Sequence, residues 1–264
     1  MPNYTRPGVE ASARLAKIRN TSIWDAIERQ YGAMIEMKGG SKLRQLDATR
    51  EALGKKLQSE KNPFLCTEDL FQVVEWKFGK GKPRHALWKH LKSIKDNELK
   101  EASRSAFQKA KEGDVKSAIE DLSKLSGVGP ATASAVLSIY RPELFAFMDD
   151  EIIECLYDGK RGYTIKIYLD INSKCCEIAD ELGAEWSCSR VGRGLWTASR
   201  ICATGGKDLT KDDQIKDAGD TDDNGDEKGS RNRSQRSRKQ ASKEKTDNEA
   251  LVPDVATTKR RKTK

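Results

Sequence analysis

Apolar residues recur at spacings of three and four along most of this chain, which is the pattern of amphipathic helices. The stretch 163–182 is ambiguous, because it holds enough β-branched residues to fit a strand as well. No set of alternating segments predicts a sheet. The pattern therefore predicts an all-α fold, with helices over residues 23–28, 41–61, 67–78, 84–94, 97–111, 114–125, 163–182 and 184–203, and two more around residues 131–140 and after residue 149.

Composition divides the chain into three parts. We expect a flexible N-terminus over 1–20, one helical domain over 21–204 and a disordered tail over 205–264. The tail lacks aromatic residues, and its charges come in blocks: acidic over 208–227, basic over 228–245, and a basic cluster at 259–262. A segment of this kind cannot bury enough apolar surface to fold alone. Its basic clusters are typical of nuclear import signals or loose nucleic-acid contacts, although a plain solubilising tail has the same composition.

The most informative motif is the segment LSGVGPATA at residues 125–133. Gly127 and Gly129 allow a tight turn, and Pro130 suits the first position of a helix, where its missing N–H costs nothing. A helical pattern precedes the glycines over 114–122, so a dinucleotide-binding loop, which requires a strand there, is not expected. The free amides at the start of the second helix predict an anion site for a phosphate, although a tight turn alone gives the same pattern.

These residues resemble the helix-hairpin-helix of the DNA glycosylase superfamily, whose members have an endonuclease III-like fold of two helical lobes. The resemblance covers about residues 67–157, with the hairpin over about 114–140. It places Asp149, downstream of the hairpin, at the position of the family's catalytic aspartate. It also implies duplex DNA as partner, bound through its backbone. The residues implied in backbone binding are Gly127, Val128, Gly129, Ala131 and Thr132.

Two departures limit the chemistry that the resemblance implies. Strand-cutting relatives carry a lysine where this chain has Ala131, and without an amine no Schiff-base lyase activity is expected at that position. The six cysteines do not have the spacing of an iron–sulfur loop, so no such cluster is expected. We expect no cofactor, apart from a structural monovalent cation at the hairpin that the resemblance allows.

Asp149 admits two interpretations. An ionised carboxylate near the sugar stabilises the positive charge that develops when an N-glycosidic bond is hydrolysed. Aspartate is also a favoured helix N-cap, and Asp149 or Asp150 can begin the apolar helix that follows. The first interpretation makes Asp149, or alternatively Asp150, the catalytic residue of a monofunctional glycosylase.

A basic segment at residues 76–90 precedes the hairpin and includes glycines and a proline typical of a loop. Its cations suit sequence-independent phosphate contacts, although solvated lysines around a tryptophan core give the same pattern. We expect Trp76 and Trp88 in the core. The two histidines, His85 and His90, have no cysteine at ligand spacing, so no metal site is expected. The candidate DNA contacts are Lys77, Lys80, Lys82, Arg84 and Lys89.

The net charge of +8 is compatible with a nucleic-acid partner, and the absence of a long apolar run predicts no membrane partner. The cysteines are expected as free thiols. Three functions remain: a nuclear base-excision glycosylase without lyase activity, a non-catalytic helix-hairpin-helix DNA clamp, and a helical protein-interaction module. The first two place the protein in the nucleus, and whether it is an enzyme stays open.

Overall fold

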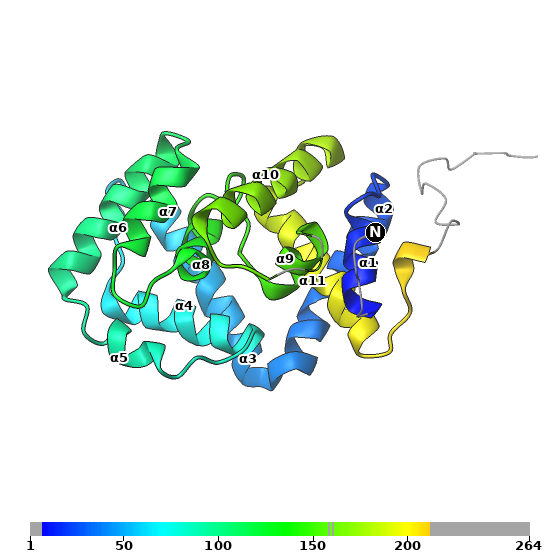
Figure 1. The fold of residues 1–264 in the computed structure, drawn as a ribbon, viewed down its shortest axis with the longest axis horizontal. Coiled ribbons are helices and arrows are strands. Elements are labelled where there is room, and N and C mark those ends of the chain that lie inside the picture. Colours follow the sequence, from blue (N-terminus) through cyan, green and yellow to red (C-terminus); the bar gives the residue numbers. More distant parts are fainter. Residues whose placement is uncertain (1–6, 158, 160, 212–264) are drawn as a thin grey trace, which may run out of the picture. The chain divides into compact units, whose positions relative to one another are not determined.

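Helices form all the regular structure in the part of the chain that the computed structural model describes, residues 7–157, 159 and 161–211 (Figure 1). These residues belong to one unit of the chain, Met1–Asp220. The helices are α1 (Pro7–Leu15), α2 (Thr21–Glu28), α3 (Tyr31–Ser59), α4 (Thr67–Lys80), α5 (Leu87–Leu91), α6 (Asp96–Lys111), α7 (Val115–Ser123), α8 (Pro130–Tyr140), α9 (Asp150–Leu156), α10 (Ile165–Leu182), α11 (Cys188–Ala203) and the 3₁₀ helix η1 (Leu209–Lys211). The all-α prediction is confirmed.

Several boundaries differ from the sequence prediction for local reasons. The helix expected over 41–61 begins at Tyr31, and it bends at Gly39 and Gly40, where Gly40 adopts a φ of 65°. The helix expected over 84–94 contracts to α5, since the segment 81–86 forms a loop. The ambiguous stretch 163–182 is helical as α10. Thr164 caps it by accepting a hydrogen bond from the amide of Ile167 at 3.3 Å.

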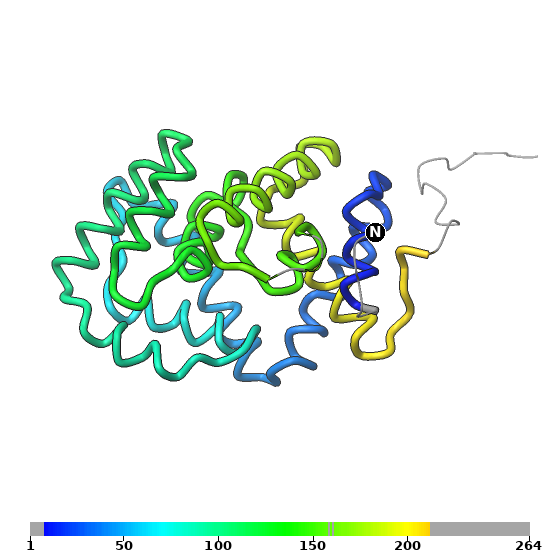
Figure 2. Tube along the Cα trace, in the orientation of Figure 1, coloured from blue at the N-terminus to red at the C-terminus, as the bar shows by residue number. Residues whose placement is uncertain are grey.

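The prediction of a flexible N-terminus is wrong for residues 7–20. Helix α1 lies along α11, as the blue and yellow segments of Figure 2 show. Ser12 Oγ donates to the carbonyl of Leu195 at 2.7 Å, and a Cβ on Gly8 would lie 2.5 Å from the carbonyl oxygen of Ser199. Small residues in α1 therefore permit a close helix–helix approach that hydrophobic periodicity does not reveal.

The predicted tail begins too early. Residues 205–211 include η1, and Asp208 pairs with Arg14 of α1. The rest of the predicted tail, 212–264, lies outside the described residues.

Helix α8 lies at the centre of the core. Each residue from Thr132 to Tyr140 is buried, and the helix contacts α3, α4, α6 and α7. The rings of Phe107 and Tyr140 lie 4.3 Å apart between centroids. Each large apolar side chain buried here contributes about 1.5–3 kcal/mol. Because α8 is held on all sides, the turn that precedes it has a fixed position.

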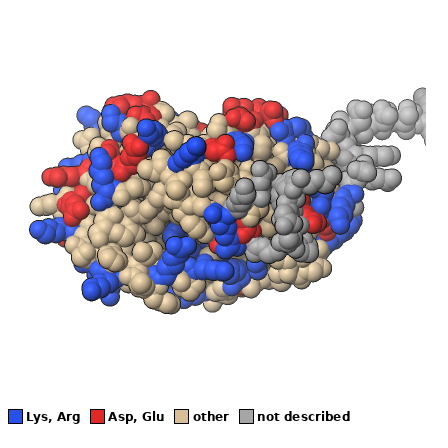
Figure 3. Space-filling model, viewed as in Figure 1, with Lys and Arg blue, Asp and Glu red and all other residues tan. Residues whose placement is uncertain are grey.

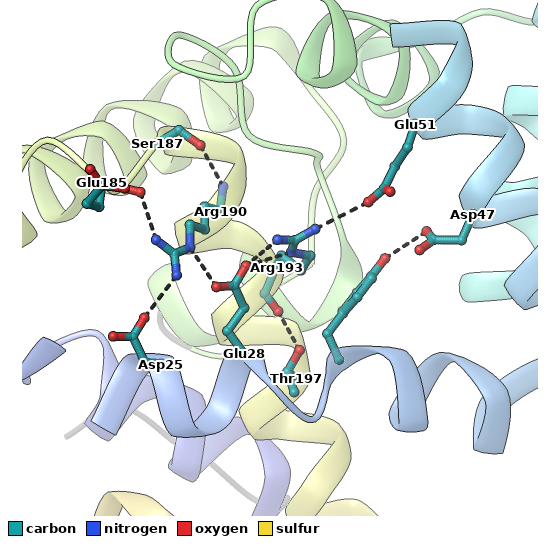
Figure 4. Close-up of polar contacts among 10 residues, drawn as sticks. Asp25, Glu28, Asp47, Glu51, Glu185, Ser187, Arg190, Arg193 and Thr197 are labelled. Atoms are coloured by element: carbon teal, nitrogen blue, oxygen red, sulfur yellow. Dashed lines mark hydrogen bonds and ion pairs between the residues drawn. The ribbon is translucent and has the colours of Figure 1, made fainter. Parts of the chain in front are cut away.

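A network of ion pairs holds α11 against α2 and α3 (Figure 4). Arg190 Nη2 lies 2.9 Å from Asp25 Oδ1, and its Nε donates to Glu28 at 2.6 Å. Arg193 also pairs with Glu28, and its Nη1 lies 3.4 Å from Glu51 Oε1. Both guanidinium groups are thus neutralised within the protein.

Among the described residues, no helix has both the length and the apolar character needed to span a membrane.

Candidate nucleic-acid interface

The turn between α7 and α8 is fixed from both sides. Gly127 adopts a φ of 79°, and a Cβ there would lie 2.9 Å from His90 Cβ, so both conformation and space require glycine. Val128 is buried, and its amide donates to the carbonyl of Leu125 at 3.0 Å. Gly129, in contrast, is exposed and has open space around its Cα. The turn is therefore rigid, yet it presents Gly129 to solvent.

The predicted backbone-binding residues divide into two groups. The amides of Val128 and Thr132 are used within the turn, since Thr132 N donates to the carbonyl of Gly129 at 2.9 Å. The amides of Gly127, Gly129 and Ala131 have no acceptor among the described residues. They stand at the N-terminus of α8, where the helix dipole favours an anion. Of the five predicted residues, all within the described part of the chain, these three therefore have amides free to donate to a phosphate.

A cavity of about 760 Å³ adjoins these amides. Its lining includes residues 127–132 of the hairpin and 147–150 before α9. The C-terminal part of α4 and the loop after it contribute Lys77, Lys82 and Arg84, and the segment before α10 contributes Arg161 and Tyr163. The structure thus brings three of the predicted DNA contacts to the hairpin. On the face shown in Figure 3, several basic side chains lie in the lower centre, while others are spread over the face, and acidic side chains lie along the upper edge and on the left.

Lys82 and Arg84 are exposed, as a phosphate contact requires, and the Arg84 guanidinium lies 4.9 Å from the centre of the Tyr163 ring. Lys89 is also exposed but does not line the cavity. The prediction that Lys80 contacts DNA is wrong for this structure, because the Lys80 side chain is buried and only 4% exposed. Its location at the last turn of α4 points it inward, toward Asp149.

Lys80 and Asp149 form a buried ion pair. Lys80 Nζ lies 2.9 Å from Asp149 Oδ2, and both side chains are shielded from solvent. Removing both charges from water is costly, and close contact with each other offsets part of that cost. Aromatic rings give further cation–π stabilisation. The ring centres within 6 Å of Nζ are those of Trp196 at 4.4 Å, Trp76 and Phe147 at 5.3 Å, and Tyr31 at 5.8 Å.

Asp149 lines the cavity and also caps α9, since its Oδ1 accepts a hydrogen bond from the amide of Asp150 at 2.9 Å. The capping interpretation is confirmed, and its catalytic role stays a prediction. The alternative, Asp150, is neutralised on the cavity wall. Tyr163 Oη donates to it at 2.6 Å, and Arg161 Nη1 lies 3.1 Å from it.

The sequence does not reveal that two groups beside this pair, Glu151 and Lys77, have shifted pKa values. Burial raises the pKa of Glu151 to about 8, assisted by the charge of Asp149 and a hydrogen bond to it. Burial lowers the pKa of Lys77 to about 8, assisted by the positive charge of Arg84. Glu151 follows two aspartates in the sequence, which was the one signal available for it. Nothing in the sequence distinguishes Lys77 from its exposed neighbours.

Among the described residues, no three His, Cys, Asp or Glu side chains lie together in an arrangement that could hold a metal ion. The six cysteines are free thiols. The monovalent cation at the hairpin stays a prediction.

Comparison with known proteins bears on the hairpin alone. A family model for the helix-hairpin-helix motif matches residues 110–139, which include α7, the turn and almost all of α8. No curated protein and no solved structure matches the chain. The chain therefore contains a helix-hairpin-helix, a motif that generally binds DNA.

Proposed function

We propose that this domain binds duplex DNA through the sugar–phosphate backbone, in the nucleus. The observation that carries the proposal is the shared cavity wall: the free amides of Gly127, Gly129 and Ala131 lie beside the exposed cations Lys82 and Arg84. Amides at a helix N-terminus bind one phosphate, and the cations neutralise others. None of these groups reads a base edge, so the binding is sequence-independent.

The substitution Gly129→Asp tests the proposal. It adds a carboxylate where a phosphate is expected, and the structure accommodates it, because no heavy atom lies within 4 Å of a Cβ at Gly129 and its φ is −110°. We expect at least a tenfold loss of duplex affinity with unchanged thermal unfolding. Gly32→Asp is the matched control, since Gly32 also has open space but lies on α3, outside the cavity. Equal affinity of the two variants would remove the hairpin from the DNA interface.

A second candidate function is base excision catalysed by Asp149. It would proceed without strand cutting, because Ala131 has no amine that could form a Schiff base. It is favoured by the location of a carboxylate, held by Lys80, on the wall of the same cavity. Preorganised charges of this kind are worth about 10²–10³ in rate. Duplexes with uracil, alkylated or oxidised bases are incubated with the protein and assayed for abasic sites. Asp149→Asn should abolish their formation.

The folding of that variant needs a control, because Asp149→Asn leaves Lys80 buried without its partner. The double variant Lys80→Met/Asp149→Asn removes both charges and is assayed beside it. Abasic sites formed by a folded double variant would remove Asp149 from the chemistry. Absence of DNA binding at any salt concentration would instead favour a protein-interaction module.

A further inference from the structure

A second basic surface lies outside the hairpin cavity, on helix α6 and the loop between α3 and α4. It surrounds a depression of about 340 Å³, whose lining includes the buried residues Pro63 and Phe107. No carboxylate of the described residues lines this basic depression. Its exposed lining consists of three cations and two amides, which are Lys61, Arg104, Lys111, Asn62 and Gln108.

The cations of the basic depression form no ion pair within the described part of the chain. The Lys111 ammonium donates to the carbonyl of Lys61 at 3.2 Å, which joins α6 to the loop and neutralises neither charge. The Arg104 guanidinium lies 5.0 Å from the centre of the Phe64 ring. Lys100, one turn earlier on α6, adds a fourth cation at 4.5 Å from the same ring. The four charges are thus held in place and left available to a ligand.

The acidic side chains nearby do not cancel these charges. Glu112 is engaged elsewhere, because it lies 3.3 Å from the Lys109 ammonium and accepts a hydrogen bond from Gln108 at 2.9 Å. Glu60 and Glu101 are close in sequence, and neither forms an ion pair with a described residue. The cations outnumber these two carboxylates, so the surface stays positive.

The basic depression and the hairpin cavity lie at opposite ends of α8. Phe107, in the depression, packs against Tyr140, the last residue of α8, with 4.3 Å between ring centres. The hairpin cavity adjoins the first turn of the same helix. Eleven residues separate the two ends by about 15 Å. No residue lines both, and α6 lies at the outer edge of the helices in Figure 1.

We infer that the basic depression binds the backbone of a second duplex DNA segment, so that the domain holds two duplexes at once. Cations and amide donors are the groups that contact phosphate oxygens. A protein partner would require apolar side chains at the centre of the interface, and none of the exposed lining residues is apolar. The inference rests on the proposed function for the first duplex, in the hairpin cavity.

A single straight duplex does not reach both surfaces. Residues 132–140 of α8 are all buried, so other parts of the protein cover the helix that separates the two surfaces. Duplex DNA is stiff over such distances, with a persistence length of about 150 base pairs, and bending it around the domain costs energy. Two separate segments can bind at the two ends without that cost.

Capture of a second duplex tests the inference. An immobilised duplex is loaded with the full chain, washed and offered a labelled duplex. Arg104→Gln/Lys111→Gln removes two charges of the basic depression. The matched control is Arg44→Gln/Lys116→Gln, because Arg44 and Lys116 are also exposed but pair with acidic residues and line neither surface.

We expect the control to capture as much labelled duplex as the unsubstituted protein does. Arg104→Gln/Lys111→Gln should capture at least tenfold less, while it binds the immobilised duplex within about threefold of the control. Equal capture by the two variants, or no capture by an unsubstituted protein that binds the first duplex, would overturn the inference. Loss of the immobilised duplex as well would place both surfaces on one duplex and would also overturn it.

A second measurement separates failure of this inference from failure of the proposed function. Gly129→Asp disables the hairpin, so the duplex affinity that remains in this variant reports on the basic depression. Adding Arg104→Gln/Lys111→Gln should weaken that affinity at least tenfold and reduce the salt slope by about 1.8. Equal affinity with and without the added substitutions would overturn the inference, whatever the hairpin does. Labelled poly-glutamate is tested in parallel, and its binding in place of duplex DNA would identify an acidic protein segment as the partner and overturn the inference.

Discussion

Two groups of basic side chains in this domain have opposite roles. Arg190 and Arg193 on α11 are engaged by carboxylates of α2 and α3, as Figure 4 shows. Lys82 and Arg84, after α4, are exposed on a cavity next to the free amides of the hairpin. The first group joins helices, and the second is available to a ligand. A basic residue therefore indicates a DNA interface only when the structure leaves its charge without an internal partner.

The surroundings of Arg193 explain this contrast. Burial alone would lower the pKa of Arg193, but the hydrogen bond and charge of Glu28 outweigh it and raise that pKa. A guanidinium so held would have to lose its carboxylates before it could bind a phosphate. Lys82 has no such cost to overcome.

The largest effect is expected from the Lys80–Asp149 pair. Lys80→Met should lower the free energy of unfolding by about 3–5 kcal/mol, because it leaves the Asp149 carboxylate buried without a counter-charge. Urea unfolding measures the loss. The double variant Lys80→Met/Asp149→Asn should recover most of it, since neither charge remains. A double variant no more stable than Lys80→Met would show that packing around the rings, and not charge, carries the effect.

Glu151 gives a prediction on pH dependence. A carboxyl group whose pKa is raised by folding, here to about 8, stabilises the fold at low pH, and that stability is lost as pH rises toward 8. The amide introduced by Glu151→Gln stays neutral at every pH, so the variant retains this stability as the pH rises. Between pH 5 and 8, unfolding free energies should therefore separate, with the unsubstituted protein losing at most about 1.4 kcal/mol per pH unit relative to the variant. Parallel pH profiles would show that Glu151 ionises normally.

The arginine network should affect stability and not DNA. Glu28→Gln weakens the hydrogen bonds from both Arg190 and Arg193, and we expect a loss of about 1–2 kcal/mol in the free energy of unfolding. Duplex affinity, measured at a temperature where both proteins are folded, should stay within twofold. A larger change in affinity would place α11 in the interface and break the comparison.

The sequence predicted the elements that local chemistry determines. The glycines of the turn, Pro130 at the start of α8 and the capping role of Asp149 all follow from residue type and spacing. The sequence does not predict the features that depend on contacts between segments far apart along the chain. Lys80 shares a basic segment with Lys82, and only the rings that α3, α11 and the segment before α9 bring around it make it a buried residue. Likewise, α1 depends on contact with α11, and the pKa of Lys77 depends on burial and on Arg84.

The salt dependence of duplex DNA binding tests the central claim most directly. Each phosphate neutralised by a side chain contributes about −0.9 to the slope of log affinity against log salt concentration. Lys82→Ala should reduce the steepness by about 0.9, whereas Arg190→Ala should leave it unchanged. Binding that does not depend on salt, or a slope that responds to Arg190 and not to Lys82, would contradict the account.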